Sequence, residues 1–124
     1  MNRTRAAAAA ILTSRVAYGV GLAVAPERLA AGWLGASASS KAGQVPLRAL
    51  GAREAAFHGA ALIALARDEP VRRWLVASIA GDLTDVVSTI AARREVPGKA
   101  PVLTVALGGG AAALSAVLAR ALER

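Results

Sequence analysis

The sequence predicts an all-α membrane protein, a four-helix transmembrane bundle with a short interfacial helix after the first span. Of its 124 residues, 56% are hydrophobic but only 3% are aromatic. A water-soluble core of this size would normally use larger aromatic anchors, whereas helices packed in lipid favour small residues. Residues 100–119 carry no charge, and about twenty such residues are enough to cross a bilayer core of about 30 Å. We therefore interpret residues 1–124 as one integral membrane domain.

Helix-breaking residues divide the chain into four expected spans. The first, residues 6–25, ends before Pro26, and the second, residues 46–67, begins with a proline, which is favoured in a first helical turn. The stretch "RDEP" separates the second span from the third, residues 71–94. In the same way, "EVPGKAP" separates the third span from the fourth, residues 101–122.

The segment between the first two spans has two expected parts. "ERLAAGWLG" predicts a short interfacial helix with Trp33 at headgroup depth, and the composition of "ASASSKAGQ" predicts a loop. The start of the chain also has features of a signal peptide: basic residues, an apolar stretch and an A-x-A at residues 23–25. Arg15 interrupts that apolar stretch, so we expect the segment to be retained as the first helix.

The charges beside the spans predict an orientation. If both termini are cytoplasmic, seven basic residues flank the spans inside and five flank them outside, a small excess in the sense of the positive-inside rule. The inner set is Arg3, Arg5, Arg67, Arg72, Arg73, Arg120 and Arg124, and the outer set is Arg28, Lys41, Arg93, Arg94 and Lys99. We expect a multi-pass protein of the cell membrane with both termini in the cytoplasm. The net charge of +7 is spread along the chain without a nucleic-acid motif, so we assign it to lipid headgroups and expect no nucleic-acid partner.

Three of the expected spans place ionisable groups near their midpoints. Arg15 lies near the middle of the first span, Glu54 and His58 flank the centre of the second, and Asp82 lies near the centre of the third. Each such group costs about 2.5 to 3.5 kcal/mol at the centre of a bilayer. We therefore expect these groups to lie in one layer and to compensate one another.

Helical angles predict which side chains share a face, at about 100° per residue. One face of the second span carries Arg48, Gly51, Glu54, Ala55, His58 and Leu62, and Arg53 points to nearly the opposite side. The third span carries a polar stripe with the spacing i, i+4, i+7, which consists of Ser78, Asp82, Asp85 and Thr89. Arg15 and Tyr18 share a face of the first span. Gly108, Gly109 and Gly110 near the middle of the fourth would allow either close backbone contact or an open cavity.

The stretch "RALGAREAAFHG", followed by "GDLTDVV", resembles a known pattern. It is similar to the R-x-x-G-x-R-E and G-D-x-x-D pattern of small, four-span bacterial membrane proteins of unknown function, which are loosely similar to DoxX-like proteins. The resemblance covers about residues 46–92, and the matching residues are Arg48, Gly51, Arg53, Glu54, Gly81, Asp82 and Asp85. It implies a four-span fold but no activity, so the function has to be argued from the site.

The polar layer predicts a site for a lipophilic small molecule. Glu54 and His58, one helical turn apart, are expected to form a proton-transfer pair, with Asp82 or Asp85 as a second carboxylate. Such a pair would serve an isomerisation, a cyclisation or an epoxide opening. The predicted catalytic residues are Glu54, His58, Asp82 and Asp85, and the predicted substrate-binding residues are Arg15, Tyr18, Arg48 and Arg53, with Arg15 or Arg53 orienting an anion.

Several alternatives stay open. The charges can be structural and fix the order of the helices, or they can relay protons or ions in a homo-oligomer or membrane complex. A soluble, alanine-rich bundle is a further alternative, since charges interrupt every span but the last.

A metal site is disfavoured because a single Glu-x-x-x-His does not match the paired Glu-x-x-His motifs of di-iron bundles, so we predict no metal and no cofactor. With no cysteine in the chain, disulfides and thiolate sites are excluded, and no phosphate-binding loop or dinucleotide fingerprint is present.

Overall fold

The computed structural model describes residues 2–123, and the described chain is all-α, as predicted. The elements in chain order are α1 (Arg3–Val24), α2 (Pro26–Leu34), the 3₁₀ turn η1 (Gly35–Ala38), α3 (Lys41–Ala66), α4 (Arg72–Ala91), α5 (Ala100–Thr104), the π-helical segment η2 (Val105–Gly109) and α6 (Gly110–Leu122). The last three follow one another without a break, so Ala100–Leu122 forms one continuous helix. The short helix expected after the first span is α2.

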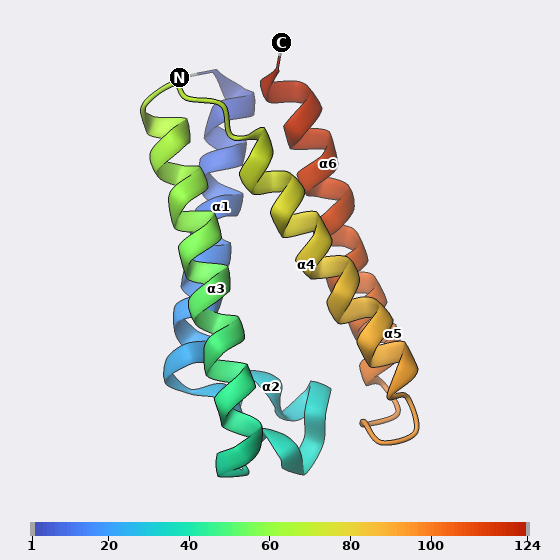
Figure 1. Cartoon of the computed structure of the whole chain (residues 1–124). Coiled ribbons are helices and arrows are strands. Elements are labelled where there is room, and N and C mark those ends of the chain that lie inside the picture. Colours follow the sequence, from blue (N-terminus) through green and yellow to red (C-terminus); the bar gives the residue numbers. More distant parts are fainter. Residues whose placement is uncertain (1, 124) are drawn as a thin grey trace.

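The helices are arranged as two close pairs. α1 packs along α3, and α4 packs along α6, whereas contacts between the pairs are sparse. The pairs approach each other near the chain termini and diverge toward the other end, where α2 lies across the opening (Figure 1). Both termini and the α3–α4 turn therefore lie at one end of the molecule, and the α4–α5 turn lies at the other.

Two apolar clusters hold the ends of the molecule together. The cluster at the terminal end includes Ala8, Leu12, Ala61, Leu65, Leu75 and Leu118, and the cluster at the α2 end consists of Leu22, Ala30, Ala38 and Leu47. Arg15 of α1 and Arg53, Glu54 and His58 of α3 fall between these two clusters along each helix. The fold thus has a polar layer between two apolar ones.

The segment between α2 and α3 differs from the prediction. A loop was expected over "ASASSKAGQ", and this expectation was wrong, because α3 begins at Lys41, five residues before Pro46. The Oγ atom of Ser40 accepts a hydrogen bond of 2.9 Å from the backbone N–H of Gly43, which satisfies one of the donors at the start of the helix. This local cap outweighed the loop-like composition, and Pro46 is accommodated inside the helix.

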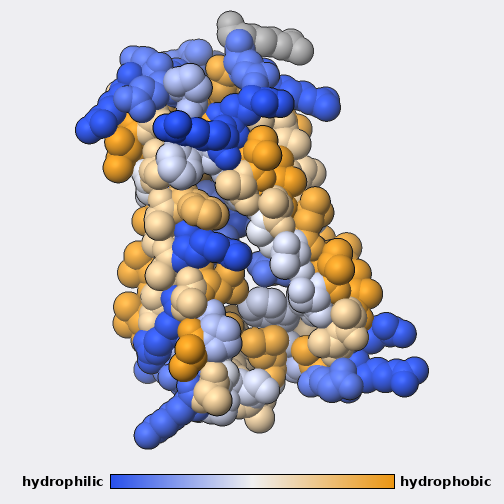
Figure 2. Space-filling view, viewed as in Figure 1, coloured by the Kyte–Doolittle hydropathy of each residue, from blue (hydrophilic) through white to orange (hydrophobic). Residues whose placement is uncertain are grey.

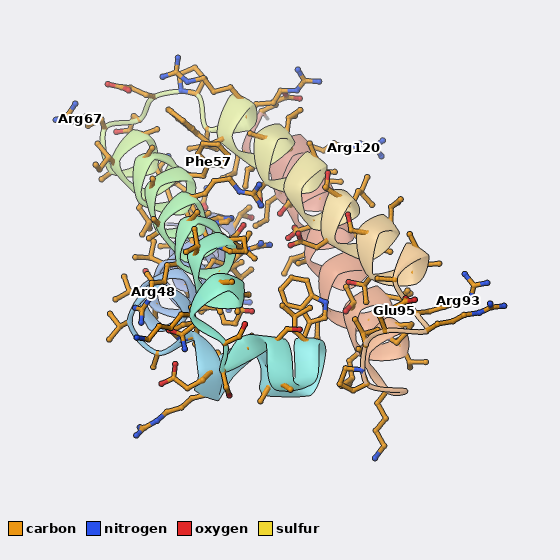
Figure 3. All side chains as sticks on the ribbon, turned by 60° about the horizontal axis from the view of Figure 1, so that its bottom comes forward. Arg48, Phe57, Arg67, Arg93, Glu95 and Arg120 are labelled. Atoms are coloured by element: carbon orange, nitrogen blue, oxygen red, sulfur yellow. The ribbon has the colours of Figure 1, made fainter. Side chains whose placement is uncertain are left out.

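The outer surface has the distribution of a membrane protein. Most side chains at mid-height are apolar, apart from a hydrophilic patch beside a hollow, and hydrophilic side chains gather at both ends (Figure 2). Three helices, Arg3–Val24, Arg72–Ala91 and Ala100–Leu122, are long and apolar enough to cross a membrane. Labelled charged residues mark the two ends: Arg67 and Arg120 at the terminal end, and Arg93 and Glu95 at the opposite one (Figure 3). These features suggest a membrane protein.

The contact between α1 and α3 depends on two glycines. A Cβ atom on Gly19 would lie 2.6 Å from the backbone N of Ala55, and one on Gly51 would lie 2.5 Å from the backbone O of Gly19. Backbone atoms at such distances cannot move aside as a flexible side chain can. Small residues at these positions therefore set the close approach of the two helices.

We expect Gly51→Ala to lower the free energy of unfolding by about 1 to 3 kcal/mol, the usual cost of overpacking. Gly59→Ala on the same helix is the matched control, because a Cβ there meets no atom within 4 Å. Thermal unfolding of both variants in detergent measures the difference. Equal melting temperatures for the two variants would contradict the close glycine contact.

Candidate functional site

The guanidinium of Arg15 is the centre of the polar layer. Nη1 and Nη2 donate to the two carboxylate oxygens of Asp82, at 2.8 and 2.6 Å, and Nη2 also donates to Oε2 of Glu54, at 2.8 Å. The Arg15 side chain is 17% exposed, and the two carboxylate side chains are nearly fully buried. One side chain from α1 thereby connects α3 and α4, in the two-pronged geometry that makes arginine–carboxylate pairs strong.

His58 lies behind Glu54 and is fully engaged by the protein. Its Nδ1 donates to the backbone oxygen of Glu54, at 2.7 Å, because a carbonyl can only accept. Its Nε2 is 2.9 Å from the hydroxyl of Ser78 on α4, and the ring is buried. Nδ1 is also 3.5 Å from Oε2 of Glu54. His58 thus holds α3 to α4 and positions Glu54.

The polar stripe predicted on α4 uses each of its members differently. Ser78 meets His58, and Asp82 meets Arg15. Thr89 accepts a hydrogen bond of 2.7 Å from the indole N–H of Trp33 and donates to the backbone oxygen of Asp85. Among the described residues, the carboxylate of Asp85 has no hydrogen-bonding partner. The stripe therefore links α4 to three other helices and leaves one carboxylate unengaged.

A cavity of about 450 Å³ lies between the helix pairs and is lined by this polar layer. Its polar wall comprises Arg15, Tyr18, Glu54, Asp82 and Asp85. Its apolar wall includes Leu29, Leu50, Leu103 and Leu107, and Trp33 covers it from α2. A hollow between the two helix pairs is visible at mid-height in Figure 2.

The π-helical segment η2 contributes to the wall formed by the last helix. Leu107 and Gly108 both belong to this segment and line the cavity. A Cβ atom on Gly108 would lie 3.3 Å from the backbone O of Asp82, so the glycine lets the last helix approach α4 at the site. A Cβ atom on Gly109 or Gly110 would meet nothing within 4 Å. Single-turn π segments inside α-helices occur frequently at functional sites.

The structure brings five of the eight predicted site residues to the cavity and leaves three away from it. His58 is behind Glu54, as described. Arg48 donates to the backbone oxygens of Ala23 and Val24, at the end of α1. It lies in the first half of α3, toward the α2 end of the molecule (Figure 3). Arg53 extends to α4, where its Nη2 is 3.3 Å from the Cβ position of Gly81. That nitrogen is buried and has no hydrogen-bonding partner within residues 2–123.

Sequence reasoning missed Trp33 and Gly32 as residues of the site. Trp33 was predicted only as a residue at headgroup depth. Its indole N–H donates to Thr89, and Trp33 lines the cavity together with Gly32. The sequence separation between Trp33 and Thr89 is 56 residues, so no local pattern could have paired them. The available signal was the tryptophan itself, which usually finds a partner for its N–H when it is buried.

The described residues contain no group of three or more histidine or acidic side chains arranged to hold a metal ion. A scan against protein-family profiles finds no match, and neither curated proteins nor solved structures give a significant match. The resemblance to the four-span pattern stays a prediction. The site must therefore be interpreted from its own geometry.

We expect Arg15→Gln to lower the free energy of unfolding by about 3 to 5 kcal/mol, because it leaves two buried carboxylates without their cation. Arg72→Gln is the control, since its ion pair with Glu123 is exposed, with side chains 66% and 50% accessible, and is worth about 1 kcal/mol or less. Chemical or thermal unfolding in detergent compares the two. Adding Glu54→Gln and Asp82→Asn to Arg15→Gln should restore part of the loss. Equal effects of the two arginine variants would contradict the central role of Arg15.

Proposed function

We propose that the chain is an integral protein of the cell membrane in which α1, α3, α4 and the helix Ala100–Leu122 each span the bilayer. α3 is the span that needs an argument, because it carries several ionisable groups. Its 26 residues rise about 39 Å, more than the hydrocarbon core. Glu54, His58 and Arg53 all reach toward neighbouring helices, as charged groups inside a membrane must.

The common location of the termini supports an even number of spans. The basic residues that flank the spans do not decide the orientation. Arg48 contacts the end of α1 that lies away from the termini, so it counts with the basic residues at the α2 end. With Arg48 included, the α2 end carries six basic residues, namely Arg28, Lys41, Arg48, Arg93, Arg94 and Lys99. The terminal end also carries six, namely Arg3, Arg5, Arg67, Arg72, Arg73 and Arg120, while Arg124 lies outside the described residues. Cytoplasmic termini stay a prediction.

We further propose that the cavity binds a lipophilic small molecule. The observation that carries this proposal is the combination of mostly apolar walls with one polar wall inside an otherwise apolar layer. Ligand sites commonly have this character, with a few positioned polar groups in an apolar pocket. A purely structural network would pack its polar groups against one another. Here Asp85 instead lines an open space and makes no hydrogen bond with the described residues.

Conversion of the bound molecule by acid–base chemistry is the enzymatic form of this proposal. A proton donor or acceptor has to reach the ligand, which favours Asp85 over His58, because both nitrogens of His58 are occupied away from the cavity. Glu54 would orient the ligand through Oε1, since its Oε2 already accepts from Arg15. His58 would act as a positioning residue for Glu54.

If the cavity binds a ligand, a side chain that fills the cavity should prevent the ligand from binding. Gly32 lines the cavity, and a Cβ there meets no atom within 4 Å, so we expect a phenylalanine at this position to be accommodated and to narrow the cavity. We expect native mass spectrometry of gently released protein to show a co-purifying lipophilic molecule in the wild type and its loss in Gly32→Phe. Gly110→Phe is the control, since Gly110 is also unobstructed but does not line the cavity. An empty wild type, or equal occupancy in Gly32→Phe, would contradict ligand binding.

The four-span topology predicts opposite accessibility of the two turns that flank α4. Because the chain has no cysteine, single variants Glu69→Cys and Gly98→Cys can be labelled in intact cells with a membrane-impermeant maleimide. With both termini cytoplasmic, Gly98→Cys should react at once, and Glu69→Cys only after permeabilisation. The reverse pattern would invert the orientation, and equal reactivity would exclude a membrane-spanning α4.

A further inference from the structure

The charges on the cavity wall restrict which molecule can bind there. The wall contains one cation, Arg15, and three carboxylates, those of Glu54, Asp82 and Asp85. Counting Arg53, which extends to α4 beside Gly81, the region has three acidic side chains against two basic ones. The sequence led us to expect that Arg15 or Arg53 orients an anion. Arg15 already makes three hydrogen bonds to Asp82 and Glu54, and Arg53 does not line the cavity.

Three carboxylate oxygens of the cavity wall make no hydrogen bond with the described residues. Glu54 is 95% buried and lines the cavity, and its Oε2 accepts from Arg15, whereas Oε1 makes no hydrogen bond with the described residues. Asp85 also lines the cavity, and neither oxygen of its carboxylate makes a hydrogen bond with the described residues. Oxygens of this kind in an apolar layer need a donor or a positive charge. A ligand that brings either would complete the polar wall.

The aromatic residues of the chain point to the same chemistry. The whole sequence has four aromatic residues, and its single tyrosine, Tyr18, and one of its two tryptophans, Trp33, both line this cavity. The bond from Trp33 to Thr89 fixes the indole in place. Faces of tryptophan and tyrosine rings attract organic cations, and they do so more strongly where water is excluded.

We propose that the ligand is a lipophilic organic cation, a protonated amine or a quaternary ammonium compound. Its charged group would lie between the carboxylates of Asp85 and Glu54 and the rings of Tyr18 and Trp33. Its apolar body would lie against the leucines contributed by α2, α3 and the last helix, which are Leu29, Leu50, Leu103 and Leu107. This inference rests on the proposed ligand-binding function and specifies its ligand class.

Three adamantane derivatives of similar size and different charge test the inference. The probes are 1-adamantylamine as the cation, 1-adamantanol as the neutral compound and adamantane-1-carboxylate as the anion, each titrated calorimetrically into the detergent-solubilised protein. We expect the amine to bind at least about tenfold more tightly than the alcohol, and the carboxylate not to bind. Gly32→Phe should abolish binding of the amine.

Charge at Asp85 is tested separately. Asp85→Asn should weaken binding of the amine about tenfold more than binding of the alcohol, and the binding that the alcohol retains reports that the cavity is intact. Glu69→Gln, an exposed carboxylate away from the cavity, is the control and should change neither affinity.

The outcomes separate the two proposals. If the alcohol or the carboxylate binds as tightly as the amine, and Gly32→Phe removes that binding, the ligand-binding function stands and the cation preference is overturned. Equal losses of amine and alcohol in Asp85→Asn would also overturn the cation preference. If no probe binds, or if Gly32→Phe leaves the binding of every probe unchanged, both proposals fail.

Discussion

The structure depends on the ion pairs of Arg15. α1 and α4 belong to different helix pairs and make few backbone contacts with each other, so the long arginine side chain is what connects them at this level. It meets Asp82 on α4 and Glu54 on α3 at hydrogen-bonding distance. In a bilayer, no water would be present to replace these partners, and a lone guanidinium or carboxylate would be costly. The hydrogen bonds of the Arg15 guanidinium thus neutralise the buried carboxylates and also fix the position of one helix pair relative to the other.

The cavity follows from the way in which the two pairs are joined. Glycines allow α1 and α3 to pack backbone against backbone, whereas α3 and α4 meet through side chains, in the apolar cluster at the terminal end and between His58 and Ser78. The pairs therefore diverge away from the termini, and α2 lies across the opening (Figure 1). Trp33 joins α2 to α4 and covers the space that the divergence leaves. The result is a partly open pocket with mostly apolar walls and one polar wall.

Stability and function place different demands on the same polar layer. Arg15, Asp82, His58 and Ser78 are engaged with one another or with neighbouring residues, as a structural network requires. Asp85 and one oxygen of Glu54 are not engaged by the described residues, although they belong to that layer. Unengaged carboxylate oxygens add nothing to the packing of helices. Their position on the cavity wall is the observation on which the proposed binding site rests.

The sequence by itself determined the helical class, the approximate positions of the long helices and the layer of ionisable residues, because these depend on composition, breakers and the 3.6-residue period. It also predicted the polar stripe on α4 correctly as a set of residues on one face. It missed the start of α3 at Lys41, where a serine cap acted against the composition. Tertiary structure alone decided the partner of each stripe residue, the engagement of both His58 nitrogens and the place of Trp33 in the cavity wall. These facts depend on how the two helix pairs diverge and on contacts between residues far apart in the chain, and helical periodicity contains no information about either.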